Sequence, residues 1–334
     1  MSPFFMLVLV IVAALIFDFI NGFHDTANAI ATVVSTGVLR ARTAVLMAAV
    51  LNVGGAFAGT AVASTMGKDI LDPSVVTQPM VLAALIAAII WNLFTWWFGI
   101  PSSSSHALVG GMVGAGLIAV GTGGIKPAGV EKVVTALVVS PFFGFFAAFV
   151  TTVAVYWIVR RMRPARVNTV FRRLQLLSSG FMAFSHGTND AQKTMGVITM
   201  ALLSYQGTYD PNAKFPVPLW VVISCALAMG LGTAMGGWRI IHTMGQKIFK
   251  LRAVHGFCAE TSAAAVLQIA SLYGLPTSTT HCITSAIMGA GATTRLSAVS
   301  WGVTRRILWA WVLTIPTTAA LSAGCYWMLG RAGL

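Results

Sequence analysis

Long runs of apolar residues dominate the chain and alternate with short polar segments. A helix needs about 20 apolar residues to cross a membrane, and about ten stretches are long and apolar enough to be candidates. The first and the sixth exceed one straight crossing, so we expect each to be broken or followed by a second half-helix. The predicted segments are 3–39, 43–66, 80–98, 101–122, 133–159, 174–203, 217–238, 253–273, 276–293 and 307–329.

Two polar strings interrupt these apolar runs, and each of them occurs twice. Residues 99–106 read Gly-Ile-Pro-Ser-Ser-Ser-Ser-His, and residues 274–281 read Gly-Leu-Pro-Thr-Ser-Thr-Thr-His. Residues 22–28 read Gly-Phe-His-Asp-Thr-Ala-Asn and correspond to residues 187–193, Gly-Thr-Asn-Asp-Ala-Gln-Lys. This repetition predicts a duplicated half, and it places the function where the two halves meet.

Composition and charge point to a multi-pass protein of the cytoplasmic membrane. The 334 residues are 57% hydrophobic and only 9% charged, whereas about 25% of residues are charged in a soluble domain. The net charge of +13 does not indicate a nucleic-acid partner, because most Lys and Arg residues lie in loops between the apolar segments. By the positive-inside rule, these loops are cytoplasmic. They are 40–42, 160–173, 239–252 and 295–306.

This loop assignment makes the two copies face opposite ways. The string at Pro101 enters the membrane from the cytoplasmic side, and the string at Pro276 enters from the external side. We therefore predict an all-α integral membrane protein with about 10–12 transmembrane helices or half-helices, in two inverted-topology repeats with broken or re-entrant helices. The first repeat is 1–159, a basic cytoplasmic linker is 160–173, and the second repeat is 174–334.

Each run of four hydroxyl residues after a proline is expected to begin a half-helix inside the membrane. Proline suits the first turn of a helix, and Ser and Thr are good N-cap residues. The free N–H groups and the positive end of the helix dipole form an anion site, to which the hydroxyls add donors. Bonding of the hydroxyls back to helix carbonyls would explain one Ser better than two matched runs. The predicted anion-binding residues are Ser102, Ser103, Ser104, Ser105, Thr277, Ser278, Thr279 and Thr280.

Acidic residues inside apolar segments are the second candidate chemistry. An ionised carboxylate at bilayer depth costs at least ~2.5 kcal/mol, so it persists where it pairs, binds a cation or carries a proton. Asp25 and Asp190 are the strongest candidates because they repeat, and Glu260 could close the same cavity. Asp18 is not repeated, and it either bonds a neighbouring helix or has a functional role.

Amide and lysine side chains accompany the repeated carboxylates. Asn28, Asn189 and Gln192 offer carbonyl oxygens of the kind that suit hard cations. Lys193 occupies the position that matches Asn28 and so breaks the symmetry of the two halves. Its ammonium could neutralise Asp190, contact a bound anion, or stand in for a coupling cation.

The histidines and cysteines give weaker signals. Four histidines lie in or beside the repeated strings: His24, His106, His186 and His281. We expect His24, His106 and His281 to be either satisfied core residues or donors that support the anion site. A proton relay through them is not established by their spacing. The four cysteines are dispersed without metal-ligand spacing, so we predict neither a metal site nor a cofactor. No protease or metal motif appears in a convincing sequence context, so we do not expect an enzyme.

Together these strings resemble the inorganic phosphate transporter (PiT) family. The resemblance rests on residues 22–29, on residues 186–193 and on both Pro-(Ser/Thr)₄-His strings. It implies symport of inorganic phosphate with H⁺ or Na⁺, a site near mid-membrane and a homodimer. In this family's pattern Asp25, Asn28, Asn189 and Asp190 line the substrate and cation site, while the hydroxyl runs hold phosphate.

Two positions depart from the family pattern. His24 stands where the first signature often has Asn, and Lys193 where the second often has Asn. The Gln-Lys form of the second motif looks like bacterial members associated with proton coupling and with metal–phosphate cargo, so the resemblance leans toward H⁺.

The sequence therefore predicts cation-coupled phosphate symport by alternating access. The alternatives are a symporter for another oxyanion or for a metal–phosphate complex, and an anion channel. Beside the hydroxyl runs, the predicted phosphate ligands are Asn28, Asn189 and Lys193. The predicted coupling-ion residues are Asp25, Asp190, Glu260, Asn28 and Gln192.

Overall fold

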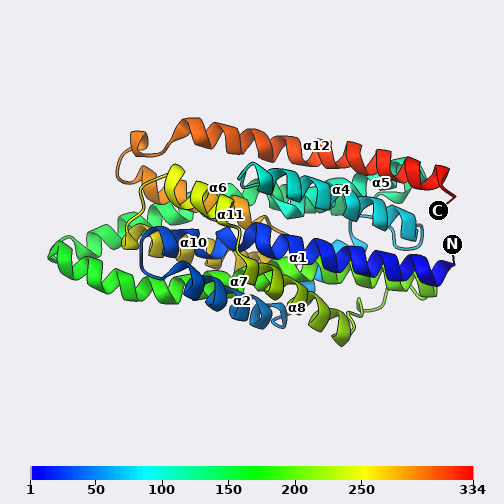
Figure 1. Ribbon diagram of the computed structural model, residues 1–334, viewed down its shortest axis with the longest axis horizontal. Helices are drawn as coiled ribbons and strands as arrows, with labels where there is room; N and C mark the ends of the chain where they lie inside the picture. The colour runs from blue at the N-terminus through cyan, green and yellow to red at the C-terminus, as the bar shows by residue number, and fades with distance from the viewer. Residues whose placement is uncertain (1, 334) are drawn as a thin grey trace.

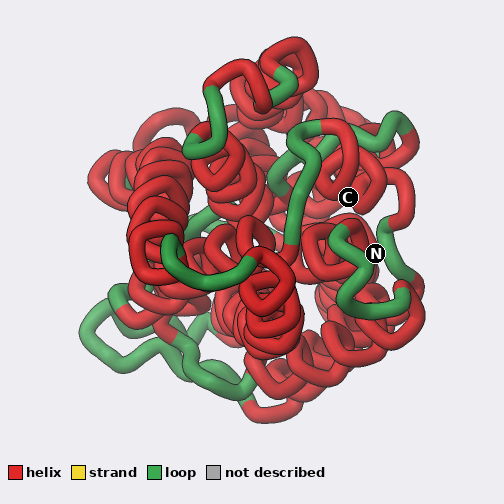
Figure 2. Tube along the Cα trace, turned by 90° about the vertical axis from the view of Figure 1, so that its left-hand side faces the viewer, coloured by secondary structure: helices red, strands yellow, loops and turns green. Residues whose placement is uncertain are grey.

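The computed structural model describes residues 2–333, which fold into a long bundle of α-helices (Figure 1). Figure 2 views the bundle from one end, with many helices nearly end-on. The first half contains α1 (Pro3–Ser35), α2 (Ala41–Ala56), α3 (Ala61–Lys68), α4 (Gln78–Trp97), α5 (Ser104–Val120) and α6 (Pro127–Val159). The second half contains α7 (Pro164–Gln206), α8 (Leu219–Met235), α9 (Trp238–His242), α10 (Ala253–Leu272), α11 (Thr279–Ala292) and α12 (Trp301–Arg331).

The helices have the length and composition of membrane spans, as the sequence predicts. Five helical stretches are long and apolar enough to cross a bilayer, and two bent pairs bring the number to as many as seven. The bent pairs are α2 with α3, at 73°, and α8 with the helical stretch Trp238–Lys247, at 61°. These features confirm an all-α membrane protein with broken helices.

The breaks do not lie in the two over-long apolar segments. Both α1, of 33 residues, and α7, of 43 residues, run as continuous helices through their Asp motifs. Of the two expected alternatives, an interruption within these helices is therefore wrong, whereas each long helix is followed by shorter, bent helices. In each half the bend falls instead in the pair of shorter helices that follows the long one. The same bend at the same place in both halves is a mark of the repeat.

The order of elements is the same in the two halves. Each half has a long helix, a bent pair, a single helix, a short helix that begins after the hydroxyl run, and a long final helix. The final helices each contain one internal proline, Pro141 in α6 and Pro316 in α12. These two prolines are separated by the same number of residues as His106 and His281. The structural repeat thus extends well beyond the two polar strings.

The two halves run in opposite directions. Thr194 of α7 donates to Asp18 of α1 at 3.0 Å, and Thr36, just after α1, donates to Gln175 of α7 at 2.9 Å. Early α1 therefore lies beside late α7, and the end of α1 lies beside early α7. In Figure 1, α1 leaves the N-terminus at the end of the bundle to which α12 returns. Antiparallel first helices are what an inverted repeat requires.

Short helices pack against the final helix of the opposite half. A Cβ added at Gly114 of α5 would lie 2.6 Å from Cα of Ala319 in α12, and one at Gly289 of α11 would lie 3.1 Å from Cα of Phe145 in α6. Glycine allows these helix backbones to approach closely, as is common between membrane helices. The core is consequently shared, and the centre of the bundle lies between the two halves.

Candidate functional site

Both hydroxyl runs begin a helix, as the sequence predicts. Ser103 is the N-cap of α5 and accepts from the His106 N–H at 3.2 Å. Ser278 is the N-cap of α11 and accepts from the His281 N–H at the same distance. Each cap satisfies one of the free N–H groups of its helix, and the other first-turn donors are left for a ligand.

The two helix starts converge on each other and on α1. Ser105, in the first turn of α5, donates to the carbonyl oxygen of Thr277 at 3.3 Å. Asn28 of α1 donates to the hydroxyl of Thr280, in the first turn of α11, at 2.9 Å. All four residues are buried. Two positive helix ends from opposite repeats therefore meet in one polar centre inside an apolar bundle.

Asp25 lies in this centre and is surrounded by neutral donors and one histidine. Its Oδ1 is 2.6 Å from Nδ1 of His24 and 3.4 Å from the hydroxyl of Thr280. Ser104 donates to its Oδ2 at 3.5 Å. The other ring nitrogen of His24 lies 3.5 Å from the hydroxyl of Ser102, which extends the network to the start of the hydroxyl run.

Asp190 is the counterpart of Asp25 on α7, and it has a charged partner. It forms a buried ion pair with Lys193, one turn further along the helix. Asn189 donates to Oδ1 at 2.8 Å and Thr279 at 3.1 Å. On the other side, Nε2 of His186 lies 3.1 Å from Oδ2. The contact of Asp190 with Thr279 repeats that of Asp25 with Ser104, because both pairs occupy equivalent positions in the two halves.

The ammonium of Lys193 is fully engaged by protein oxygens. Besides Asp190, it donates to the hydroxyl of Ser105 and to the carbonyl oxygen of Thr277, the latter at 2.7 Å. An ammonium has three donors, so all of them have acceptors in this arrangement. The side chain of Lys193 is 3% exposed. The structure thus brings together Asp25, Asp190, Asn28, Asn189, Lys193 and the eight hydroxyl residues.

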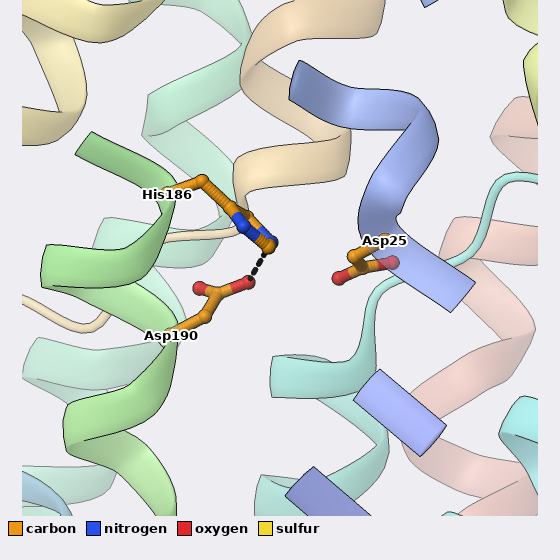
Figure 3. Close-up of side chains that lie close together, drawn as sticks. All are labelled: Asp25, His186 and Asp190. Atoms are coloured by element: carbon orange, nitrogen blue, oxygen red, sulfur yellow. Dashed lines mark ion pairs between the residues drawn. The ribbon is translucent and has the colours of Figure 1, made fainter. Parts of the chain in front are cut away.

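Figure 3 shows Asp25 of α1 facing His186 and Asp190 of α7. One ligand atom from each of these three residues lies within 4.8 Å of the others, a spacing that suits a metal ion. No metal motif is evident in the sequence, since the ligands come from distant segments. His186 is absent from the predicted site residues, although its place four residues before Asp190, on the same helix face, is a usable signal.

Gln192 lies outside this centre, although it was predicted to bind the coupling ion. Its Oε1 accepts from the Val62 N–H at 2.9 Å and from the Ala63 N–H at 3.4 Å. Its Nε2 donates to the carbonyl oxygen of Thr188 at 2.7 Å. Both ends of the amide are therefore occupied by backbone groups, and the side chain holds the start of α3 at the bend between α2 and α3.

Glu260 of α10 belongs to a separate buried cluster. Its carboxylate accepts from Thr32 and Ser178, and from Gln175 at 3.1 Å. Thr32 is seven residues beyond Asp25 on α1, which is about 10 Å along a helix. Asp18 also lies apart from the centre, bonded to α7 through Thr194. This is the structural alternative that the sequence left open for Asp18.

His106 and His281 lie side by side and line a cavity between α6, α11 and α12. The two ring centroids are 4.4 Å apart, and His281 stacks on Trp311 at 3.8 Å. The cavity has a volume of about 810 Å³ and is lined mainly by apolar side chains, among them Phe142 and Phe146. These two imidazoles therefore belong to the first turns of α5 and α11 and line an apolar space.

The chain matches known phosphate transporters over nearly its whole length. The phosphate transporter family matches twice, at residues 21–166 and 160–322. A probable low-affinity inorganic phosphate transporter of Rhizobium meliloti is 52% identical over 96% of both chains, and one of Bacillus subtilis is 47% identical over the same shares. A solved structure of a sodium-dependent phosphate transporter superposes with a TM-score of 0.88 at 29% identity, over 98% of this chain and 99% of that one.

Proposed function

The chain belongs to the phosphate transporter family, and on that premise we propose that it carries inorganic phosphate across a membrane by cation-coupled symport with alternating access. It is a multi-pass membrane protein and a transporter, not an enzyme. The observation that carries the proposal is the convergence of two half-helix starts, one from each repeat, on two buried carboxylates.

The phosphate is held between the starts of α5 and α11. Their N–H groups and dipoles favour an anion. The hydroxyls add donors that rotate to fit the oxygens of the ligand. The side-chain amides of Asn28 and Asn189 already contact these hydroxyl runs at Thr280 and Thr279. The predicted ligands 102–105, 277–280, Asn28 and Asn189 form this cradle.

The two carboxylates have two roles beside an anion. They bind or carry the coupling cation, H⁺ or Na⁺, whose charge then favours phosphate entry. A carboxylate also accepts a hydrogen bond from a protonated phosphate oxygen, which sulfate lacks at neutral pH. With sulfate bound, the buried carboxylate would lack this donor, and an unpaired buried acceptor costs about 1–3 kcal/mol. The contact therefore favours phosphate over sulfate. Glu260 serves as a further cation or proton group outside the centre.

The burial of the site supports alternating access. Asp25 is 3% exposed and Asp190 is 2% exposed, so neither side of the membrane reaches them in this conformation. The antiparallel repeats offer two related ways of opening, one toward each side. We place the basic loops on the cytoplasmic side of a cell membrane, and the assembly is a homodimer by resemblance to the family.

Uptake of radiolabelled phosphate into proteoliposomes tests this proposal, with Na⁺ and H⁺ gradients imposed separately. The wild type should accumulate phosphate above equilibrium, which a channel cannot do. Asp25→Asn and Asp190→Asn should each abolish coupled uptake, whereas Asp210→Asn, a matched change in an exposed loop, should not. Wild-type uptake by both site variants would refute the proposal. Unlabelled sulfate and arsenate, added as competitors, separate it from transport of another oxyanion.

A metal–phosphate complex is the second candidate cargo. It is favoured by the cluster of Asp25, His186 and Asp190, whose ligand atoms face one another across the site. In that case uptake of phosphate and of a divalent cation should rise and fall together in proteoliposomes. His186→Ala should remove the dependence on the divalent cation. Full phosphate uptake in the presence of a chelator would exclude this cargo.

A further inference from the structure

Lys193 and Asn28 occupy equivalent positions in the two repeats and make equivalent contacts. Asn28 of α1 donates to Thr280 at the start of α11, and Lys193 of α7 donates to Ser105 at the start of α5. Thr280 and Ser105 are themselves the matching last residues of the two hydroxyl runs. Each side chain thus reaches from the first helix of its own half to the half-helix of the other, but only the second one carries a charge.

The ammonium of Lys193 sits in an oxygen cage. Its three acceptors are a carboxylate (Asp190), a hydroxyl (Ser105) and a backbone carbonyl (Thr277). Oxygens of these kinds are the ligands of a hard cation. Since the three donors are all engaged, no N–H is left to contact phosphate directly in this conformation. The side chain therefore occupies a cation position in this conformation. Of the three roles that the sequence leaves open, these contacts favour neutralisation of Asp190 and replacement of a coupling cation over contact with the anion.

The equivalent position in the first half has the same kinds of oxygen but no fixed cation. Asp25 contacts hydroxyls and His24, and its ion-pair contact within residues 2–333 is with that imidazole alone. The carbonyl oxygen of Asn28, Oδ1, is buried and has no hydrogen-bond partner in the same part of the chain. A buried acceptor without a partner marks a place where a ligand would compensate for its lost hydration.

We propose that Lys193 is a tethered cation, which fills in the second half the place that a mobile coupling cation takes beside Asp25 and Asn28 in the first half. The transporter therefore uses one coupling cation fewer per phosphate than a site with Asn in both halves. This inference rests on the proposed symport. A tethered charge stays with the protein. Each transported phosphate is therefore accompanied by one positive charge fewer than in a transporter with two mobile cations at these positions.

The test uses Lys193→Asn, which copies Asn28 and makes the two halves alike. The net charge moved per phosphate is measured in proteoliposomes from the membrane potential at which a fixed phosphate gradient gives no flux. The ratio is expected to rise by one positive charge relative to the wild type, whichever cation the wild type uses. Lys193→Met, which has a similar length but no charge and no oxygen, and Lys193→Arg, which keeps the charge, are the matched controls. An unchanged ratio in Lys193→Asn would overturn the inference.

A second measurement does not require transport. NaCl, compared with choline chloride, should raise the thermal unfolding temperature of Lys193→Asn more than that of the wild type, because the variant has gained a cation site and binding stabilises the folded state. Lys193→Met should gain less, and Lys193→Arg nothing. The tethered cation would be contradicted if neither Na⁺ nor a lower pH stabilised Lys193→Asn more than the wild type. Failure of the symport proposal is distinct, because wild-type proteoliposomes would then not accumulate phosphate.

Discussion

Replacement of Asp190 by Asn should destabilise the protein more than replacement of Asp25 by Asn, although the two residues are equivalent by symmetry. Asp190→Asn leaves the ammonium of Lys193 buried without a counter-charge, and breaking a buried ion pair from one side costs about 3–5 kcal/mol. Asp25 has no ammonium partner among the described residues. Its main loss is a charged hydrogen bond to His24, worth about 1.5–3 kcal/mol.

Thermal unfolding in detergent, followed by tryptophan fluorescence, measures the difference. For a chain of this size 1 kcal/mol corresponds to about 2 °C, so Asp190→Asn should lower the Tm by about 6–10 °C and Asp25→Asn by about 3–6 °C. Adding Lys193→Asn to Asp190→Asn removes the orphaned charge and should raise the Tm again. The reasoning fails if Asp25→Asn is the more damaging change, or if the second substitution lowers the Tm further.

Three further outcomes follow from contacts elsewhere in the bundle. Gly114→Val should lower the Tm and the yield of folded protein, because the added Cβ would meet the backbone of Ala319. The control Gly324→Ala, which has open space around it, should instead stabilise the helix by about 0.5–1 kcal/mol. Equal yields and Tm values for the two variants would contradict the close packing of α5 on α12. Ser103→Ala and Ser278→Ala should each lower the free energy of unfolding by about 1 kcal/mol through loss of an N-cap. Both variants should also bind phosphate more weakly, as measured by calorimetry, whereas Asn at either position should retain the cap. Gln192→Met should speed amide hydrogen exchange at Val62 and Ala63, which lose their acceptor, and unchanged exchange there would show that the side chain does not hold α3.

The polar strings could be interpreted from the sequence because their structure is local. A proline followed by hydroxyl residues specifies the start of a helix through backbone geometry and capping within a few residues. Ser103 and Ser278 accordingly cap α5 and α11 as predicted. The inverted arrangement was also accessible, since loop charges give orientation without knowledge of packing. The convergence of the two starts follows once both facts are combined.

The direction of side chains inside the bundle could not be predicted in the same way. Gln192 is adjacent to site residues in the sequence, but a helix turns successive side chains by about 100°, and Gln192 faces the bend between α2 and α3. Glu260 lies within an apolar segment and is therefore expected to close the same cavity, yet its carboxylate accepts from Thr32 and Ser178. His186 stands beside the second repeated string, but its proximity to Asp25 depends on how α1 packs on α7, which the sequence does not specify.

The location of the helix breaks was missed for a related reason. Apolar length shows that a segment exceeds one crossing, but it does not show whether the helix ends or simply projects beyond the lipid. In α7 the basic first turns continue the helix outside the apolar core, and Arg172 donates to the carbonyl oxygen of Gly37 at 2.7 Å. The helix therefore continues beyond the apolar segment, and its basic first turns contact the residues that follow α1.

The short helix of each half packs on the final helix of the other half, so the order in which the chain is synthesised determines when these contacts can form. α5 packs on α12 and α11 packs on α6, so the first half enters the bilayer before its complement has been translated. Until then the glycine-bearing faces at Gly114 and Gly144 remain open to lipid or to chaperones. A nascent chain halted near residue 163 should therefore be an inserted but unassembled intermediate, sensitive to protease, and maturation must wait for the last helix to leave the ribosome.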